Sequence, residues 1–98
     1  MSHYMVEIAL SEVMTEGFAE KIPAQRQKVN EMMEQGVLTS YALAEDRSKL
    51  WCIVKADSEY EVMSLVSEFP LIDYMDLAIT ELMFHNMVAL RLPLFSLN

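Results

Sequence analysis

The sequence predicts an α+β fold with the element order β-α-β-β-α-β, which is the ferredoxin-like split βαβ arrangement. Two segments have helical spacing with a recognisable cap or stop, and four segments have the alternation of strands. A short polar turn separates the second strand from the third. The chain has 98 residues, the size of one domain. We expect residues 1–86 to form this domain and residues 87–98 to form an apolar tail.

The first strand is predicted at residues 3–11, where both alternating faces are largely apolar. A helix is predicted at residues 16–35, with Gly36 as its C-terminal cap. Its apolar stripe consists of Phe18, Ile22, Val29 and Met33, with Met32 beside them. Pro23 leaves two possibilities within this segment: the helix proper begins at Pro23, or a short turn precedes it.

Residues 37–44 and 49–56 are predicted as the second and third strands, joined by the polar turn Glu45–Ser48. Ser58 and Glu61 form a capping box, so a second helix begins there and runs to about Ser67. Pro70 ends this helix. The fourth strand is predicted at residues 72–84.

The composition indicates a partner subunit. Hydrophobic residues make up 53% of the chain, which is more than a small domain can bury alone. In this fold both helices cover one face of the sheet and leave the other face open. The open face is expected to carry Met5, Ala9 and either Leu77 or Ala78, depending on register. Two such sheets packed face to face would make a homodimeric α+β barrel with a cavity between them.

The net charge of −8 disfavours binding to nucleic acid or to an anionic membrane surface. No apolar run reaches the roughly 20 residues that span a bilayer. A single cysteine, Cys52, fits a reducing cytoplasm. Two histidines without metal-ligand spacing give no reason to expect a metal site. Residues 87–95 are nearly all apolar, and we expect this tail to dock on its own or a neighbouring subunit.

Residues 69–85, FPLIDYMDLAITELMFH, resemble the C-terminal motif of the muconolactone delta-isomerase family. The matching positions are Pro70, Leu71, Tyr74, Met75, Asp76, Thr80, Leu82 and His85. In coarse form the resemblance extends over residues 4–85. It implies a cofactor-free isomerase, which moves a double bond in an unsaturated lactone that bears a carboxylate. Such a reaction needs a base, an acid, stabilisation of the dienolate and a cation for the carboxylate.

Glu7 is the candidate base, because it interrupts an apolar strand and a water-poor cavity would make its carboxylate more basic. The alternative is that Glu7 pairs with a lysine or tyrosine at the rim of the barrel. Tyr74 and Asp76 are two residues apart and are expected to share a face of the fourth strand as further catalytic residues. Their alternative roles are packing of Tyr74 against a helix or the dimer seam and backbone hydrogen bonding by Asp76.

Arg47, on the hairpin turn, is the candidate for binding the carboxylate, and its alternative is an ion pair with Glu45 or Asp46. Tyr41 is expected either to line the cavity or to pack in the core. The second strand carries no cation, whereas the family tends to have basic residues there. This departure favours a second hypothesis, in which the protein is a non-catalytic ligand-binding module of the same fold. A third hypothesis is a cofactor-independent monooxygenase, which is supported by fold analogy alone.

Overall fold

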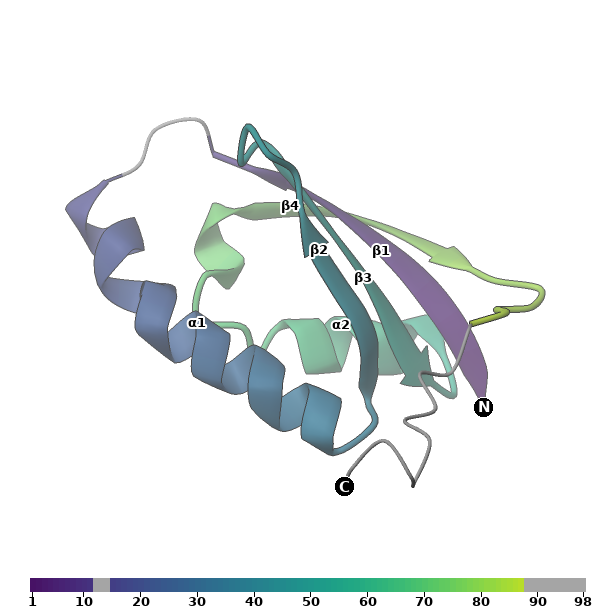
Figure 1. Cartoon of the computed structure of the whole chain (residues 1–98). Coiled ribbons are helices and arrows are strands. Elements are labelled where there is room, and N and C mark those ends of the chain that lie inside the picture. The colour runs from purple at the N-terminus through teal and green to yellow at the C-terminus, as the bar shows by residue number, and fades with distance from the viewer. Residues whose placement is uncertain (12–14, 88–98) are drawn as a thin grey trace, which may run out of the picture.

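The computed structural model describes residues 1–11 and 15–87. Two helices lie on one side of a four-stranded antiparallel sheet (Figure 1). The strands are β1 Ser2–Leu10, β2 Leu38–Leu43, β3 Lys49–Ala56 and β4 Met75–Glu81, and the helices are α1 Glu16–Glu34 and α2 Glu59–Val66. The strand order β2-β3-β1-β4 confirms the ferredoxin-like α+β class. The dimeric barrel stays a prediction.

Both helices begin at side-chain caps. The hydroxyl of Ser58 accepts a hydrogen bond from the backbone N–H of Glu61 at 3.1 Å, as the capping box predicts. The hydroxyl of Thr15 does the same for Phe18 at 3.1 Å. α1 is therefore one helix from Glu16 onward, and the prediction that Pro23 marks a helix start or follows a turn was wrong. Pro23 and Ala19 are both exposed, so water can bond the Ala19 carbonyl that a proline leaves without a helical donor.

The fourth strand is shorter than predicted. Ile72–Tyr74 form a 3₁₀ turn, and β4 begins only at Met75. The turn closes because the N–H of Ile72 donates to the Phe69 carbonyl at 3.0 Å and that of Tyr74 to the Leu71 carbonyl at 2.9 Å. Burial of Phe69 and Leu71 against the core fixes this bend before the chain enters the sheet. Tyr74 therefore does not lie on the strand, contrary to the prediction.

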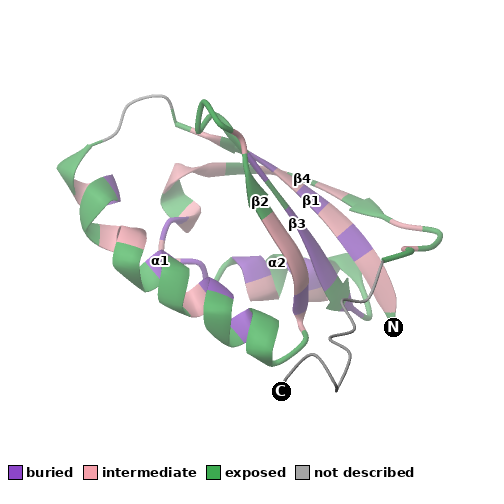
Figure 2. Ribbon diagram, viewed as in Figure 1, coloured by how far each residue is buried: buried purple, intermediate pink, exposed green. Residues whose placement is uncertain are grey.

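The core lies between the sheet and the helices (Figure 2). On β1, Val6 and Ile8 are 0% exposed, and Val62 and Val66 of α2 are equally buried. The C-terminal half of α1 contributes Val29 and Met32 to the same core, whereas Met33, expected on the apolar stripe, is exposed. At about 25 cal/mol per Å² of apolar surface, this burial is the main stabilising contribution.

The register defines the open face of the sheet. Glu7 pairs with Trp51 on one side and Ala78 on the other, and Met5 pairs with Ile53 and Thr80. These positions alternate with the buried residues of β1, so they all face away from the helices. Of the two residues considered for β4, Ala78 lies on the open face, and Leu77 lies on the helix side.

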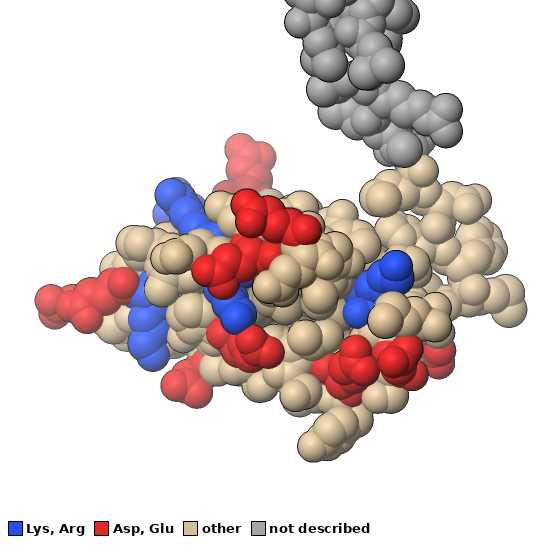
Figure 3. All heavy atoms as spheres, turned by 90° about the horizontal axis from the view of Figure 1, so that it is seen from below, with Lys and Arg blue, Asp and Glu red and all other residues tan. Residues whose placement is uncertain are grey.

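Acidic and basic side chains are interspersed on the face shown in Figure 3, where no cluster of Lys and Arg alone is seen. No helix in the described part of the chain is long and apolar enough to cross a membrane. The tail predicted at residues 87–98 lies outside the described residues, apart from Met87. Its predicted docking role therefore stays a prediction.

Candidate active site

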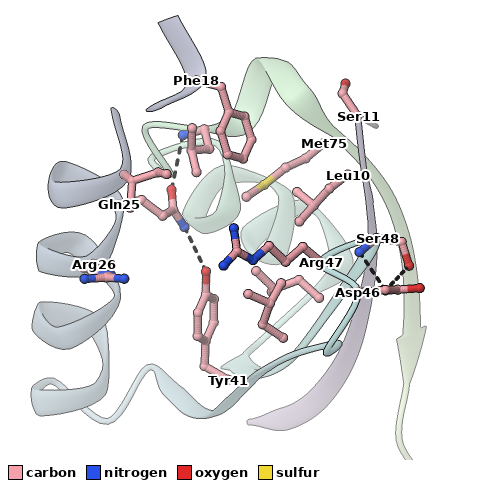
Figure 4. Close-up of a pocket in the computed structure, with 14 residues that line it drawn as sticks. Leu10, Ser11, Phe18, Gln25, Arg26, Tyr41, Asp46, Arg47, Ser48 and Met75 are labelled. Atoms are coloured by element: carbon pink, nitrogen blue, oxygen red, sulfur yellow. Dashed lines mark hydrogen bonds between the residues drawn. The ribbon is translucent and has the colours of Figure 1, made fainter. Parts of the chain in front are cut away.

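A pocket of about 640 Å³ lies between the N-terminal half of α1 and the end of the sheet that carries the β2–β3 hairpin. It is on the helix side of the sheet, whereas the sequence predicted a cavity on the open face between two subunits. Most of its wall is apolar, and the side chains that line it are Leu10, Ser11, Phe18, Ile22, Gln25, Arg26, Tyr41, Leu43, Asp46, Arg47, Ser48, Leu50, Leu71 and Met75 (Figure 4).

Tyr41 and Gln25 form the polar inner wall of the pocket. The side-chain amide nitrogen of Gln25 donates to the Tyr41 hydroxyl oxygen at 3.3 Å, and its carbonyl oxygen accepts from the backbone N–H of Leu71 at 3.1 Å. The ring of Tyr41 also packs edge-on against Phe69, with centroids 6.4 Å apart. Burial raises the pKa of Tyr41, while the Gln25 hydrogen bond acts in the opposite direction. The phenol is therefore protonated at neutral pH.

Arg47 brings a positive charge into the pocket from the hairpin. Its backbone has φ of 64°, the left-handed region that side-chain-bearing residues rarely adopt. Its N–H donates to the Ala44 carbonyl at 2.9 Å, which closes the turn. Figure 4 shows the Arg47 side chain pointing toward Gln25 and Tyr41. Among the described residues Arg47 takes part in no ion pair, so its guanidinium is available to an anion.

Asp46 is the one carboxylate in the described pocket lining, and it is already engaged. One of its oxygens accepts from the backbone N–H of Ser48 at 3.0 Å and from the Ser48 hydroxyl at 2.7 Å. These hydrogen bonds lower the pKa of Asp46. A carboxylate with a lowered pKa is a weak base. Asp46 therefore stabilises the hairpin turn and is poorly suited to abstract a proton from a ligand.

A sequence model of one family matches residues 3–87 of this chain, and that family is muconolactone delta-isomerase. The chain belongs to the muconolactone delta-isomerase family. A comparison with curated protein sequences gave no significant match. Apart from Ser2 at the start of β1, the match covers every element of the fold, including α1, the hairpin and the residues before β4 that together enclose the pocket.

Three residues that the resemblance marked for isomerase chemistry lie outside the pocket lining. Glu7 is on the open face and forms an ion pair with Lys49 at 3.2 Å, with about half of each side chain exposed (46% and 51%). This pair is the alternative that the sequence left open for Glu7. The sheet itself separates the Glu7 carboxylate from the pocket of the same chain.

Tyr74 and Asp76 do not share a face, contrary to the prediction. Tyr74 packs edge-on against Phe18 of α1, with centroids 5.1 Å apart, and the Lys21 ammonium lies 5.8 Å from its ring centre. Asp76 pairs with Ala9 in the β1–β4 register, which places it on the open face. The reason is the 3₁₀ turn, because it removes Tyr74 from the alternation of β4.

Of the predicted ligand-binding residues, Arg47 and Tyr41 both line the pocket, together with two residues that the sequence reading did not single out. Gln25 and Arg26 reach the pocket from α1. Gln25 falls three residues after Ile22 and four before Val29, so it is a polar residue inside an apolar helical stripe. That interruption is the signal that could have identified it. Within the described residues, no group of three or more His, Cys, Asp or Glu side chains is placed to hold a metal.

Proposed function

We propose that this chain binds a small, partly apolar carboxylate of the carboxylated-lactone class in the pocket between α1 and the sheet. The observation that carries the proposal is Arg47, a guanidinium directed into an apolar pocket and unpaired among the described residues. A guanidinium in such surroundings favours a carboxylate, which it can bind with two parallel hydrogen bonds. The apolar wall would receive the ring of the ligand.

We further propose that the bound lactone undergoes the proton shift that the family name describes. A protonated Tyr41 hydroxyl, in the same pocket as the guanidinium of Arg47, would stabilise the oxygen that becomes negative in the dienolate. Both groups are present before any ligand arrives, as electrostatic stabilisation requires. The net change moves one proton from a ring carbon of the lactone to another carbon, so it needs no cofactor; the group that carries this proton is not identified among the described pocket residues.

A second candidate is ligand binding without catalysis. It is favoured by the lack of a strong base in the described pocket lining, since Asp46 is held by Ser48 and its pKa is lowered. Glu7, the base proposed from the sequence, lies beyond the sheet. The two candidates share the same ligand and the same cation, and they differ only in turnover.

The experiment has a binding arm and a turnover arm. Calorimetric titration with muconolactone should show binding to wild type and about tenfold or greater weakening in Arg47→Asn, because hydrogen bonds to charged groups are the strong ones. Asparagine is chosen because it tolerates the left-handed backbone. Lys55→Gln, which removes an exposed charge outside the pocket, is the matched control and should bind like wild type.

The turnover arm follows the absorbance of muconolactone and related butenolides. Binding with a change in absorbance supports the isomerase, and binding without any change across a panel of such lactones supports the binding module. If wild type binds no carboxylated lactone, or if Arg47→Asn binds as well as wild type, the proposed function is wrong.

A further inference from the structure

Gln25 is the one polar residue among the buried side chains of the described chain, with 4% exposure. It connects three segments, because it lies on α1, donates to Tyr41 of β2 and accepts from Leu71 before the 3₁₀ turn. A buried amide with both ends satisfied has a fixed orientation, since rotating it would leave two groups unpaired. Its role in the pocket follows from which end faces which partner.

The backbone fixes that orientation. The N–H of Leu71 can only donate, so the carbonyl oxygen of Gln25 must face it. The NH₂ group of Gln25 then faces Tyr41 and donates to the hydroxyl oxygen. The hydroxyl proton of Tyr41 cannot point back at a donor, and no described side chain or backbone group accepts it. Tyr41 and Arg47 both line the pocket, and in Figure 4 the Arg47 side chain points toward Tyr41.

The polar wall of the pocket therefore presents donors to a ligand. The guanidinium of Arg47 has no acceptor, and Tyr41 has its oxygen occupied and its proton unused. Burial also raises the pKa of Tyr41, so the hydroxyl keeps this proton over the physiological pH range. A ligand group that carries acceptors alone, such as a carboxylate or a lactone carbonyl, can accept from both Arg47 and Tyr41.

We propose that Gln25 is a positioning residue that fixes Tyr41 as a hydrogen-bond donor, and that it thereby makes the pocket selective for ligands with an acceptor oxygen at this wall. The inference rests on the proposed function for the identity of the ligand. It goes further in stating how the pocket distinguishes an acceptor oxygen from a group of similar size that can only donate, such as an amide N–H. Such a difference arises because a buried donor facing another donor is left unpaired.

The test is Gln25→Glu, which keeps the shape and makes the direction of the hydrogen bond depend on pH. The introduced carboxyl group, when protonated, offers its C=O to Leu71 and its O–H to Tyr41, as the amide does. When ionised it has acceptors alone, so Tyr41 turns its proton toward it and away from the ligand. The probe is the methyl ester of muconolactone, which is uncharged and excludes simple charge repulsion as the cause; it gives up the carboxylate pair with Arg47 in wild type and variant alike, so only their ratio is compared.

At pH 8 the variant should bind the ester about tenfold more weakly than wild type, the worth of one neutral hydrogen bond and its desolvation. Its affinity should return toward the wild-type value as the pH falls to 5, while wild-type affinity stays flat. Gln27→Glu adds the same charge on the exposed side of the same helix and is the matched control. A flat profile for Gln25→Glu, or a loss that does not recover at low pH, overturns the proposal.

A measurement without ligand separates this inference from the proposed function and does not depend on the charged variant. The ring-carbon chemical shift of Tyr41, assigned with Tyr41→Phe, reports its titration. Donation from Gln25 stabilises the phenolate, so Gln25→Met, checked for folding by circular dichroism, should raise the pKa of Tyr41. An unchanged or lowered pKa overturns the role of Gln25 even if lactones bind. If no lactone binds but the pKa rises, the proposed function fails and the direction of the hydrogen bond stands.

Discussion

Replacing Arg47 with glycine should stabilise the protein and weaken its ligand binding at the same time. The φ of 64° places Arg47 in the left-handed region, which costs a residue with a side chain roughly 1–2 kcal/mol. Glycine avoids that cost but loses roughly 0.5–1 kcal/mol more backbone entropy on folding. The difference is a net gain of about 0.7 kcal/mol in the free energy of unfolding. Because Arg47 is exposed, little packing is lost to offset it.

For a domain of this size, that gain corresponds to a rise in Tm of roughly 3–6 °C. Thermal and denaturant unfolding followed by circular dichroism measure it. The same Arg47→Gly protein should bind a carboxylated lactone about tenfold or more weakly, because the guanidinium is gone. Stability and binding therefore change in opposite directions, as expected where backbone strain is kept at a binding site.

Glu45→Gly is the matched control on the same hairpin. Among the described non-glycine residues the positive φ belongs to Arg47, so Glu45 has no such backbone strain to relieve. This substitution incurs the entropy cost of glycine without relieving strain, and should lower the free energy of unfolding by about 0.5–1 kcal/mol. If Arg47→Gly destabilises the protein as much as Glu45→Gly, the left-handed backbone is not strained. If its lactone affinity equals that of wild type, Arg47 is not the anion anchor.

Four further outcomes are expected. Ser58→Ala removes the cap of α2 and should lower the free energy of unfolding by about 1 kcal/mol in urea titrations; no change would mean the cap is dispensable. Burial raises the pKa of Cys52 to about 12, so at pH 8 its thiol should react with a disulfide reagent only after unfolding. Light scattering should show a dimer or larger, and Ala78→Lys on the open face should shift it toward monomer; a wild-type monomer of 11.3 kDa would refute the open-face interface. Glu7→Gln should leave lactone binding and turnover unchanged. A fall in turnover of about 10²- to 10⁴-fold would instead identify Glu7 as the catalytic base.

Local patterns were sufficient to predict most of the fold. The span of β3, Lys49–Ala56, and the cap at Ser58 follow from alternation and from a short-range hydrogen bond, both of which are local properties. The start of β4 could not be read in this way. Ile72–Tyr74 was predicted as the start of the strand, with Asp73 its one charged residue, yet burial of the preceding Phe69 and Leu71 bends the chain into a turn. Tertiary packing decided that boundary, and the predicted face of Tyr74 was wrong as a result.

The candidate site likewise combines residues that local sequence patterns indicate with a residue that only tertiary packing reveals. Arg47 and Tyr41 were predicted to bind ligand at a cavity between subunits; both line a pocket on the helix side of the sheet instead, and ligand binding by them stays a prediction. The sequence does not single out Gln25, because its two hydrogen-bond partners lie 16 and 46 residues away in the chain. Periodicity shows that its position faces inward, but it does not show what it meets there. The pairing that gives Gln25 its role exists only once α1, β2 and the segment before β4 have packed together.

The sheet separates the predicted ligand-binding residues from two of the predicted catalytic residues, although the family resemblance placed them in one site. On one side lie the cation and the hydroxyl donor that suit a carboxylated lactone, in a pocket formed by a single chain. On the other side lie Glu7 and Asp76, on an open face that a second subunit would cover in the expected barrel. A base on one face of a sheet cannot reach a proton on a ligand bound against the other. If the pocket is the place of reaction, its base is not Glu7 of the same chain; if Glu7 is the base, the reacting ligand lies between subunits, and the pocket beneath α1 is a second binding site. Binding and turnover measured in parallel for Arg47→Asn and Glu7→Gln decide between these arrangements, because each substitution changes one face of the sheet alone.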